Sequence, residues 1–278
     1  MSKPPSNSDI FIAILLLLFV LLLVAIIIYS FLNILETFYI AIFGKPAFIY
    51  TNIINKKLSK EQKKILENEF LFYKKLTDKR KIKFEHRVAM FIKRYNFYGK
   101  EDLEITDQMK VLIASTAIML TFGFREYLFT VIDKIIIYPD VYYSSATEQY
   151  HKGEFNPKMK ALVFSWAHFL EGYQSKEDNL NLGIHELAHV LHFQGLKSTH
   201  TSAAIFADTY TKLMKEVMYQ PNLQKLIASD YFRIYAYTNQ FEFIAVLLEH
   251  FFETPEDFKK EFPQLFYKIK KMINYREL

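Results

Sequence analysis

The twenty-residue run Ile10–Tyr29 contains no charged side chain and no side-chain amide. A helix rises about 1.5 Å per residue, so this run is long enough for the hydrocarbon core of a bilayer, which is about 30 Å thick. A cleaved signal peptide is disfavoured, because the run exceeds the usual apolar length, Asp9 directly precedes it, and no small-residue cleavage pattern follows. We therefore predict an uncleaved, single-pass anchor that contacts the lipid bilayer through Ile10–Tyr29.

Apolar character continues over Phe31–Phe43, interrupted by Asn33 and Glu36. These residues are too few for a second span and are interpreted as an interfacial extension. The predicted organisation is an N-terminal tail (1–9), the anchor with its extension (10–43), a linker (44–57) and one folded domain (58–278).

The formal net charge of +5 hides an uneven distribution. Between Lys56 and Lys100 there are fifteen Lys and Arg but five acidic residues, so this segment is strongly basic and the rest of the chain is acidic. The positive-inside tendency predicts an external N-terminus and a cytoplasmic domain, with the basic segment attracted to anionic headgroups. A solvated helix surface without a lipid role is the alternative. No recognition motif accompanies the charge, so direct nucleic-acid binding is not expected.

The chain has no cysteine, which excludes disulfides, Cys-ligated zinc and thiol catalysis. Its many aromatic residues are interspersed with Ile, Leu and Lys and are interpreted as core packing.

Local patterns predict a mostly helical α+β domain with a small sheet. Ser59 and Gln62 form a capping-box pattern at a helix start. Further helices are predicted over Lys83–Tyr95 and Asp107–Leu120, and short strands over Lys134–Tyr138 and Lys160–Trp166. Two or three strands grouped among many helices favour α+β over a strictly alternating fold.

The strongest chemical signal is the HExxH motif that His185, Glu186 and His189 form. On a helix, histidines at i and i+4 project from one face and can hold a single Zn²⁺. Glu186 is placed to take a proton from the reacting water rather than to bind the metal. The alternative is a helix with two core or surface histidines beside an acid.

A catalytic zinc site needs a third protein ligand. The extended HExxHxxGxxH form is absent, because His192 stands where Gly would be required and neither Gly195 nor Leu196 supplies the histidine that should follow. Glu242 is the best candidate, since it lies in an almost wholly apolar helical stretch where a carboxylate needs a partner or a metal. Glu249 is interpreted as a partner of a ligating histidine, the ligand itself, or a helix-end carboxylate near solvent. His250 is a less favourable ligand.

The segments HELAHVLH and YAYTNQFEFIAVLLEHFFETPEDFKKEFPQLF resemble the zinc-dependent peptidase family of Mlc titration factor A, with similarity from about Leu58 to Lys271. The resemblance implies a gluzincin-like fold, ligands at His185, His189 and Glu242, and a general base at Glu186. It also implies an oxyanion-stabilising tyrosine at Tyr235, and an edge strand at Leu162–Trp166 that aligns the substrate.

Two features depart from this family. His192 replaces a common acid and is interpreted as a satisfied helix histidine or an extra pocket group. The N-terminal anchor is a further difference from the best-known member.

The resulting prediction is a membrane-anchored metallopeptidase with one Zn²⁺ per chain, which hydrolyses a peptide or protein substrate through a zinc-activated water. One alternative, implied by the resemblance, is a regulatory protein that sequesters a transcriptional repressor or another partner at the membrane without hydrolysis. Another is a degenerate protease fold without metal.

Overall fold

The structure is a computed structural model that describes residues 6–50, 54–144, 148–175 and 178–276. The chain forms two compact units, which divide between Ala47 and Phe48. The N-terminal unit is dominated by helix α1 (Asn7–Phe43), which Ser6 and Asp9 cap reciprocally. Gly44, at a φ of 62°, ends the helix by adopting the left-handed conformation that glycine tolerates best.

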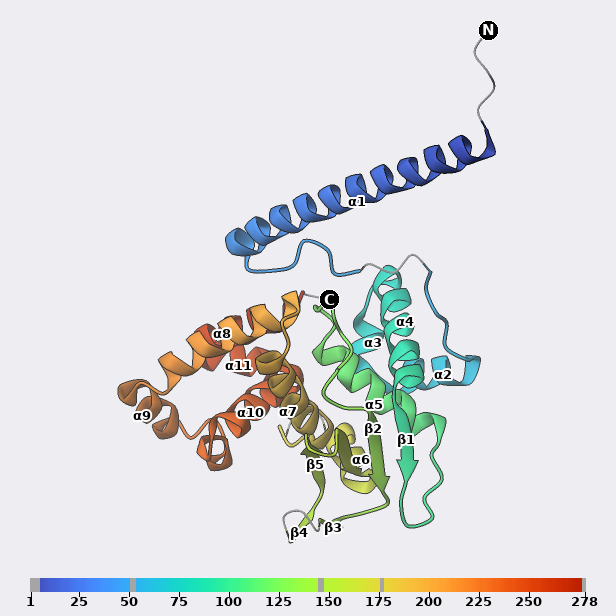
Figure 1. The fold of residues 1–278 in the computed structure, drawn as a ribbon. Coiled ribbons are helices and arrows are strands. Elements are labelled where there is room, and N and C mark those ends of the chain that lie inside the picture. The colour runs from blue at the N-terminus through green and yellow to red at the C-terminus, as the bar shows by residue number, and fades with distance from the viewer. Residues whose placement is uncertain (1–5, 51–53, 145–147, 176–177, 277–278) are drawn as a thin grey trace. The chain divides into compact units, whose positions relative to one another are not determined.

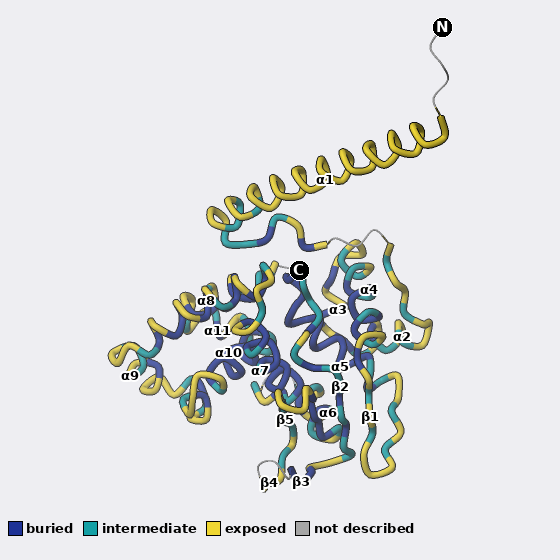
Figure 2. The backbone as a smooth tube through the Cα atoms, in the orientation of Figure 1, coloured by how far each residue is buried: buried dark blue, intermediate teal, exposed yellow. Residues whose placement is uncertain are grey.

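Helix α1 has no buried residue (Figure 2) and is long and apolar enough to cross a membrane. It includes both the predicted span and the predicted extension, so the two are one uninterrupted helix rather than separate segments. Asn33 and Glu36 do not break it, because isolated polar residues cost a helix little backbone stability.

The second unit is mostly helical with a small sheet (Figure 1), which confirms the predicted fold class. The helices that precede strand β2 along the chain are α2 (Lys60–Glu69), α3 (Leu71–Lys75), α4 (Asp78–Arg94) and α5 (Asp107–Leu120). The later helices are α6 (Trp166–Gln174), α7 (Leu182–Lys197), α8 (Thr201–Val217), α9 (Gln220–Ala228), the 3₁₀ helix η1 (Ile234–Tyr237), α10 (Gln240–Glu253), α11 (Pro255–Glu261) and α12 (Pro263–Met272).

The predicted capping box is confirmed, because the Ser59 side chain accepts from Gln62 N–H and Gln62 caps Ser59 in return. Helix α5 matches its prediction, whereas α4 begins five residues before the predicted Lys83. The first turn of α4 is almost entirely charged, so it lacks the apolar period from which a helix is identified.

The described residues form six strands rather than the predicted two or three. They are β1 (Asn96–Gly99), β2 (Lys134–Tyr138), β3 (Tyr142–Ser144), β4 (Gln149–His151), β5 (Gly153–Asn156) and β6 (Ala161–Ser165). The four-stranded sheet has the order β1-β2-β6-β5, in which only β5 is antiparallel to its neighbour, and β3 and β4 pair separately. The missed strands have three or four residues each, too few to display a periodic pattern.

The predicted edge strand at Leu162–Trp166 is wrong. Strand β6 lies inside the sheet between β2 and β5, all five of its residues are buried, and Trp166 already belongs to α6. The edge next to β6 is formed instead by β5. A fully buried apolar strand is typical of a sheet interior, where both neighbouring positions are occupied by strands. An edge strand instead has one row of unpaired backbone groups open to solvent.

Helix α7 lies at the centre of the unit and packs against α5, α6, α8, α10 and strand β5. Eleven of its sixteen residues are buried, and Figure 2 shows it among the most buried helices. Its polar side chains are therefore held by a rigid core on several sides.

Candidate metal centre

Helix α7 positions the two histidines of the HExxH motif. Asn181 caps its first turn by accepting a hydrogen bond from Ile184 N–H at 2.9 Å. His185 and His189 follow one turn apart on the same face, and their Nε2 atoms lie 3.2 Å from each other. The predicted helical setting of the motif is confirmed.

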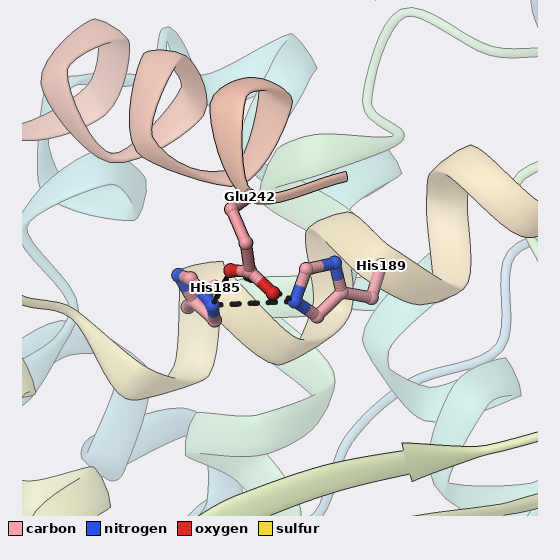
Figure 3. Close-up of side chains that lie close together, drawn as sticks. All are labelled: His185, His189 and Glu242. Atoms are coloured by element: carbon pink, nitrogen blue, oxygen red, sulfur yellow. Dashed lines mark hydrogen bonds and ion pairs between the residues drawn. The ribbon is translucent and has the colours of Figure 1, made fainter. Parts of the chain in front are cut away.

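Glu242 reaches the same point from α10. The Asn239 side chain caps this helix and accepts from the N–H groups of Phe241 and Glu242. Glu242 Oε2 lies 3.0 Å from His185 Nε2 and 3.6 Å from His189 Nε2 (Figure 3). The structure thus brings together the three residues that the sequence analysis selected, although Glu242 follows His189 by 53 positions along the chain.

The donor set fits a tetrahedral metal ion. Metal–ligand bonds of about 2.0–2.1 Å at tetrahedral angles separate neighbouring ligand atoms by about 3.3 Å, and the three observed separations lie around this value. Glu242 Oε2 is buried and accepts no well-aligned hydrogen bond, despite its closeness to both imidazoles. Two imidazole nitrogens and one carboxylate oxygen are also ligands that Zn²⁺ commonly takes.

Glu249 lies behind His185 rather than beside the cluster of ligand atoms. Its Oε1 is 3.4 Å from His185 Nδ1, and its Oε2 accepts a 2.6 Å hydrogen bond from Arg233 Nη2. With 1% of its surface exposed, it is a buried partner of a histidine and neither a ligand nor a solvent-facing carboxylate.

The surroundings shift the pKa values of the two histidines in opposite directions. Burial alone lowers the pKa of His185, but the adjacent carboxylates of Glu242 and Glu249 more than reverse this effect, so the site favours a positive charge on His185. Burial, followed by the His185 charge, lowers the pKa of His189 to about 4. His189 is therefore neutral at pH 7, as a metal ligand must be.

Glu186 lies between α7 and the edge strand β5. Burial raises the pKa of its carboxyl to about 7, although the Phe155 backbone hydrogen bond opposes the rise. Gly153 makes this approach possible, because a Cβ there would lie 2.7 Å from Glu186 Cγ. The open edge of β5 thus faces the general-base candidate.

Tyr235 comes from η1, and its ring centroid is 6.1 Å from that of His185. Burial, the Glu242 charge and a hydrogen bond to Glu242 raise the pKa of its phenol to about 12. The phenol is protonated at neutral pH and can donate a hydrogen bond into the site.

His192 and His250 lie outside the centre. His192 packs 4.3 Å from the Tyr210 ring and 4.6 Å from the Phe241 ring, measured between centroids. Neither ring nitrogen of His192 has a hydrogen-bond partner among the described residues, so it is neither a satisfied helix histidine nor a group of the cleft. His250 packs against Tyr231 and Phe232 on the other side of α10.

Sequence reasoning missed Arg233, which joins the site through Glu249. A signal was present, since Arg233 is the single Lys or Arg between Leu226 and Phe258. A cleft of about 430 Å³ opens beside the centre, lined by Gly153, His168, Glu171, His185, Glu186 and Arg233 among others. It is large enough to admit several residues of an extended peptide.

The chain is similar in sequence to a known protein family and to one further protein. The family described as glucose-regulated metallo-peptidase M90 matches residues 49–274, which include every residue of the centre. The chain is also similar to the uncharacterized protein slr2042 of Synechocystis sp.. The two are 25% identical over 229 residues, and the match covers 74% of this chain and 81% of that protein.

Proposed function

The chain belongs to the M90 family of glucose-regulated metallopeptidases, and from this premise we propose that it is a membrane-anchored, zinc-dependent metallopeptidase that hydrolyses peptide bonds. One observation carries the proposal. His185 Nε2, His189 Nε2 and Glu242 Oε2 converge within 3.0–3.6 Å of one another, with the carboxyl of Glu186 on the same helix beside a cleft. These residues would hold one Zn²⁺ per chain.

A Zn²⁺ held by His185, His189 and Glu242 would supply Lewis-acid chemistry, which polarises a carbonyl and lowers the pKa of water to near neutrality. Glu186 takes a proton from the attacking water and later delivers it to the leaving amine. A buried carboxyl with a pKa near 7 suits both steps, because its affinity for the proton is matched to the pH of the reaction.

Tyr235 and β5 contact the substrate in this proposal. The Tyr235 phenol donates a hydrogen bond to the oxyanion that develops on the scissile carbonyl. An extended peptide pairs with the open edge of β5, whose Phe155 N–H already points toward Glu186. This places the peptide between the edge strand and the metal ligands of α7.

Helix α1 anchors the enzyme as a single membrane span, with the catalytic unit in the cytoplasm. Its length, its apolar composition and the basic residues that follow it support this proposal. A reporter fused to the C-terminus tests the orientation, and an external reporter signal would overturn it.

Replacing Glu186 by Gln tests the mechanism. In the detergent-solubilised full chain, Glu186→Gln should lower turnover of a peptide library by about 10²-fold or more and leave about one zinc bound. Glu256→Gln is the matched control, because Glu256 is an exposed glutamate on α11 and does not line the cleft. Retained turnover in Glu186→Gln would contradict the proposed role of Glu186. Less than about a tenth of a zinc ion bound per wild-type chain would contradict the proposal that the protein is a zinc enzyme.

The binding alternative makes a different prediction. A regulatory protein that sequesters a partner without hydrolysis should bind that partner equally well after His185→Ala. A pull-down with both proteins separates the two functions, since loss of turnover with unchanged binding would favour the regulatory role.

A further inference from the structure

The first residues of the second unit are fixed to its surface by two arginines. Arg87, on α4, is 2% exposed and donates hydrogen bonds of 2.8–3.2 Å to backbone carbonyls of Ile49, Thr121, Phe122 and Phe124. Arg125 Nε donates to the Phe48 carbonyl at 2.8 Å. The place where the chain joins this unit is therefore well defined.

Basic groups gather at this place around the ring of Tyr50. Lys83 Nζ lies 5.7 Å from the ring centroid, and Arg87 Cζ lies 4.9 Å from it. Burial raises the pKa of Tyr50, and the charges of Arg87, Arg80 and Arg276 oppose that rise, so these cations also act on the same ring. Arg80 and Arg276 are joined by a 3.2 Å hydrogen bond from Arg80 Nη2 to the Arg276 carbonyl.

A cavity of about 570 Å³ adjoins the cluster, and its polar lining includes Lys56, His86, Arg87 and Arg125. The hydrogen bonds of Arg87 described above go to neutral carbonyls and do not cancel its charge. Glu126, whose charge acts on Arg87, is one carboxylate against the three cations Lys56, Arg87 and Arg125. The cavity is consequently suited to an anionic group such as a phosphate.

Two apolar side chains project from the same surface. Phe48 is 71% exposed and Ile54 is 84% exposed. The carbonyl of Phe48 is held by Arg125, and Ile54 lines the cavity. Exposed apolar side chains among basic groups are typical of surfaces that bind anionic membranes, because the former enter the interface while the latter contact headgroups.

The covalent connection favours a membrane as the occupant. Helix α1 ends at Phe43 and the second unit begins at Phe48, so four residues join them. Four extended residues reach about 14 Å. If α1 spans the bilayer through Ile10–Tyr29, its remaining helical residues add about 21 Å before this connection. The surrounding surface of the second unit then stays within about 35 Å of the headgroups and can reach them.

We propose that this surface, here called the basic face and made up of Phe48, Ile54, Arg80, Lys83, Arg125 and Arg276, docks the peptidase unit onto anionic phospholipids of the membrane that holds α1. The inference rests on the proposed anchoring by α1. It adds that the catalytic unit is seated on the bilayer by a lipid-specific contact instead of being tethered freely.

The absence of cysteine makes this contact measurable in the full chain. Two single-cysteine variants are labelled separately with an environment-sensitive fluorophore. Ile54→Cys places the fluorophore on the basic face, and Tyr219→Cys places it at a control position away from that face. Tyr219 is 62% exposed and lies beyond the opposite end of α8 from Ser202, about 25 Å along that helix. Both proteins are reconstituted into nanodiscs of phosphatidylcholine, with or without about 30% phosphatidylglycerol.

Spin-labelled lipids should quench the fluorophore at position 54 at least twice as strongly in anionic discs as in neutral discs, and the one at 219 equally in both. Arg80→Gln with Lys83→Gln should lower the ratio of docked to undocked protein about tenfold, since each basic residue near an anionic surface adds to the free energy of membrane binding. Lys212→Gln with Lys215→Gln, an exposed pair of the same spacing on α8, should leave it unchanged.

Equal quenching at position 54 in both lipid mixtures would overturn the docking proposal, as would quenching that is unaffected by Arg80→Gln with Lys83→Gln. Failure of the chain to co-elute with nanodiscs would instead overturn the anchoring on which it rests. The peptidase proposal is separable, because His185→Ala should dock like the wild type while losing turnover.

Discussion

Arg233 Nη2 lies 2.6 Å from the buried Glu249 Oε2, and this ion pair adjoins Nδ1 of His185, whereas Nε2 of the same ring approaches Glu242. A carboxylate that accepts from Nδ1–H fixes the histidine tautomer and leaves the Nε2 lone pair for a metal. Arg233 holds that carboxylate, and its Nη1 also donates to the Asn179 carbonyl. The pair therefore positions a ligand without touching the metal itself.

Arg233→Met should weaken zinc binding by about 10- to 100-fold, because Glu249 would remain buried without its cation and would hold His185 less firmly. Competition with a chelator measures the affinity. Arg233→Lys should recover part of the loss, whereas Lys225→Met, at an exposed position on α9, should have no effect. Unchanged affinity in Arg233→Met would show that the ion pair does not position the ligand.

Gly153→Ala should lower turnover about tenfold or more while bound zinc stays near one equivalent. The new Cβ would lie 2.7 Å from Glu186 Cγ and 2.9 Å from Leu182 Cδ1, so Glu186 must move away from its place beside the cleft. Peptide turnover and metal analysis of the same sample check this. Lys158→Ala, exposed in the turn after β5, is the control, and full activity in Gly153→Ala would contradict the assigned position of Glu186.

His250 should make the fold sensitive to mild acid. Burial, aided by the Arg233 charge, lowers its pKa to about 4, and Tyr231 and Phe232 pack against the ring. The folded state favours the neutral imidazole of His250. The contribution of this group to the free energy of unfolding is therefore complete above the unfolded-state pKa of about 6.5, and it is lost as the pH falls toward 4. The melting temperature of the wild type should therefore decrease over this interval.

Replacing the titrating group by Gln isolates this contribution. The decrease in melting temperature between pH 6.5 and 4.5 should be smaller in His250→Gln than in the wild type by on the order of 5 °C. Thermal unfolding followed by circular dichroism gives the measurement. His200→Gln, at an exposed position, should keep the wild-type slope, and an unchanged slope in His250→Gln would argue against a buried neutral histidine.

Much of the metal centre could be predicted from local pattern. The spacing of His185 and His189 places both rings on one helix face whatever the surrounding fold, because helical periodicity is a property of the backbone. Glu242 could be selected because a carboxylate within an apolar helix needs a partner. Arg233 was not selected, although it is the single Lys or Arg between Leu226 and Phe258, since its isolation carries no periodic or spacing pattern that assigns it a role.

The sheet was predicted less well for a related reason. Strand β2 has a regular run of branched apolar residues and was found with its observed ends, whereas β5 consists of Gly-Glu-Phe-Asn and has no such pattern. Its strand conformation is set by pairing with β6. Which strand lies at the edge is likewise a matter of pairing order, and β6 was wrongly assigned that place from the family resemblance.

The sequence by itself determined the long apolar helix, the mostly helical α+β class and the pair of histidines with its adjacent acid. Each of these depends on composition or on spacing within one element. Only the tertiary structure decided that Glu242 meets both imidazoles, that Arg233 and Glu249 stand behind His185, and that β5 presents its edge to Glu186. These relationships join segments far apart in the chain, and their geometry is fixed by the packing of α7, α10 and the sheet around one core.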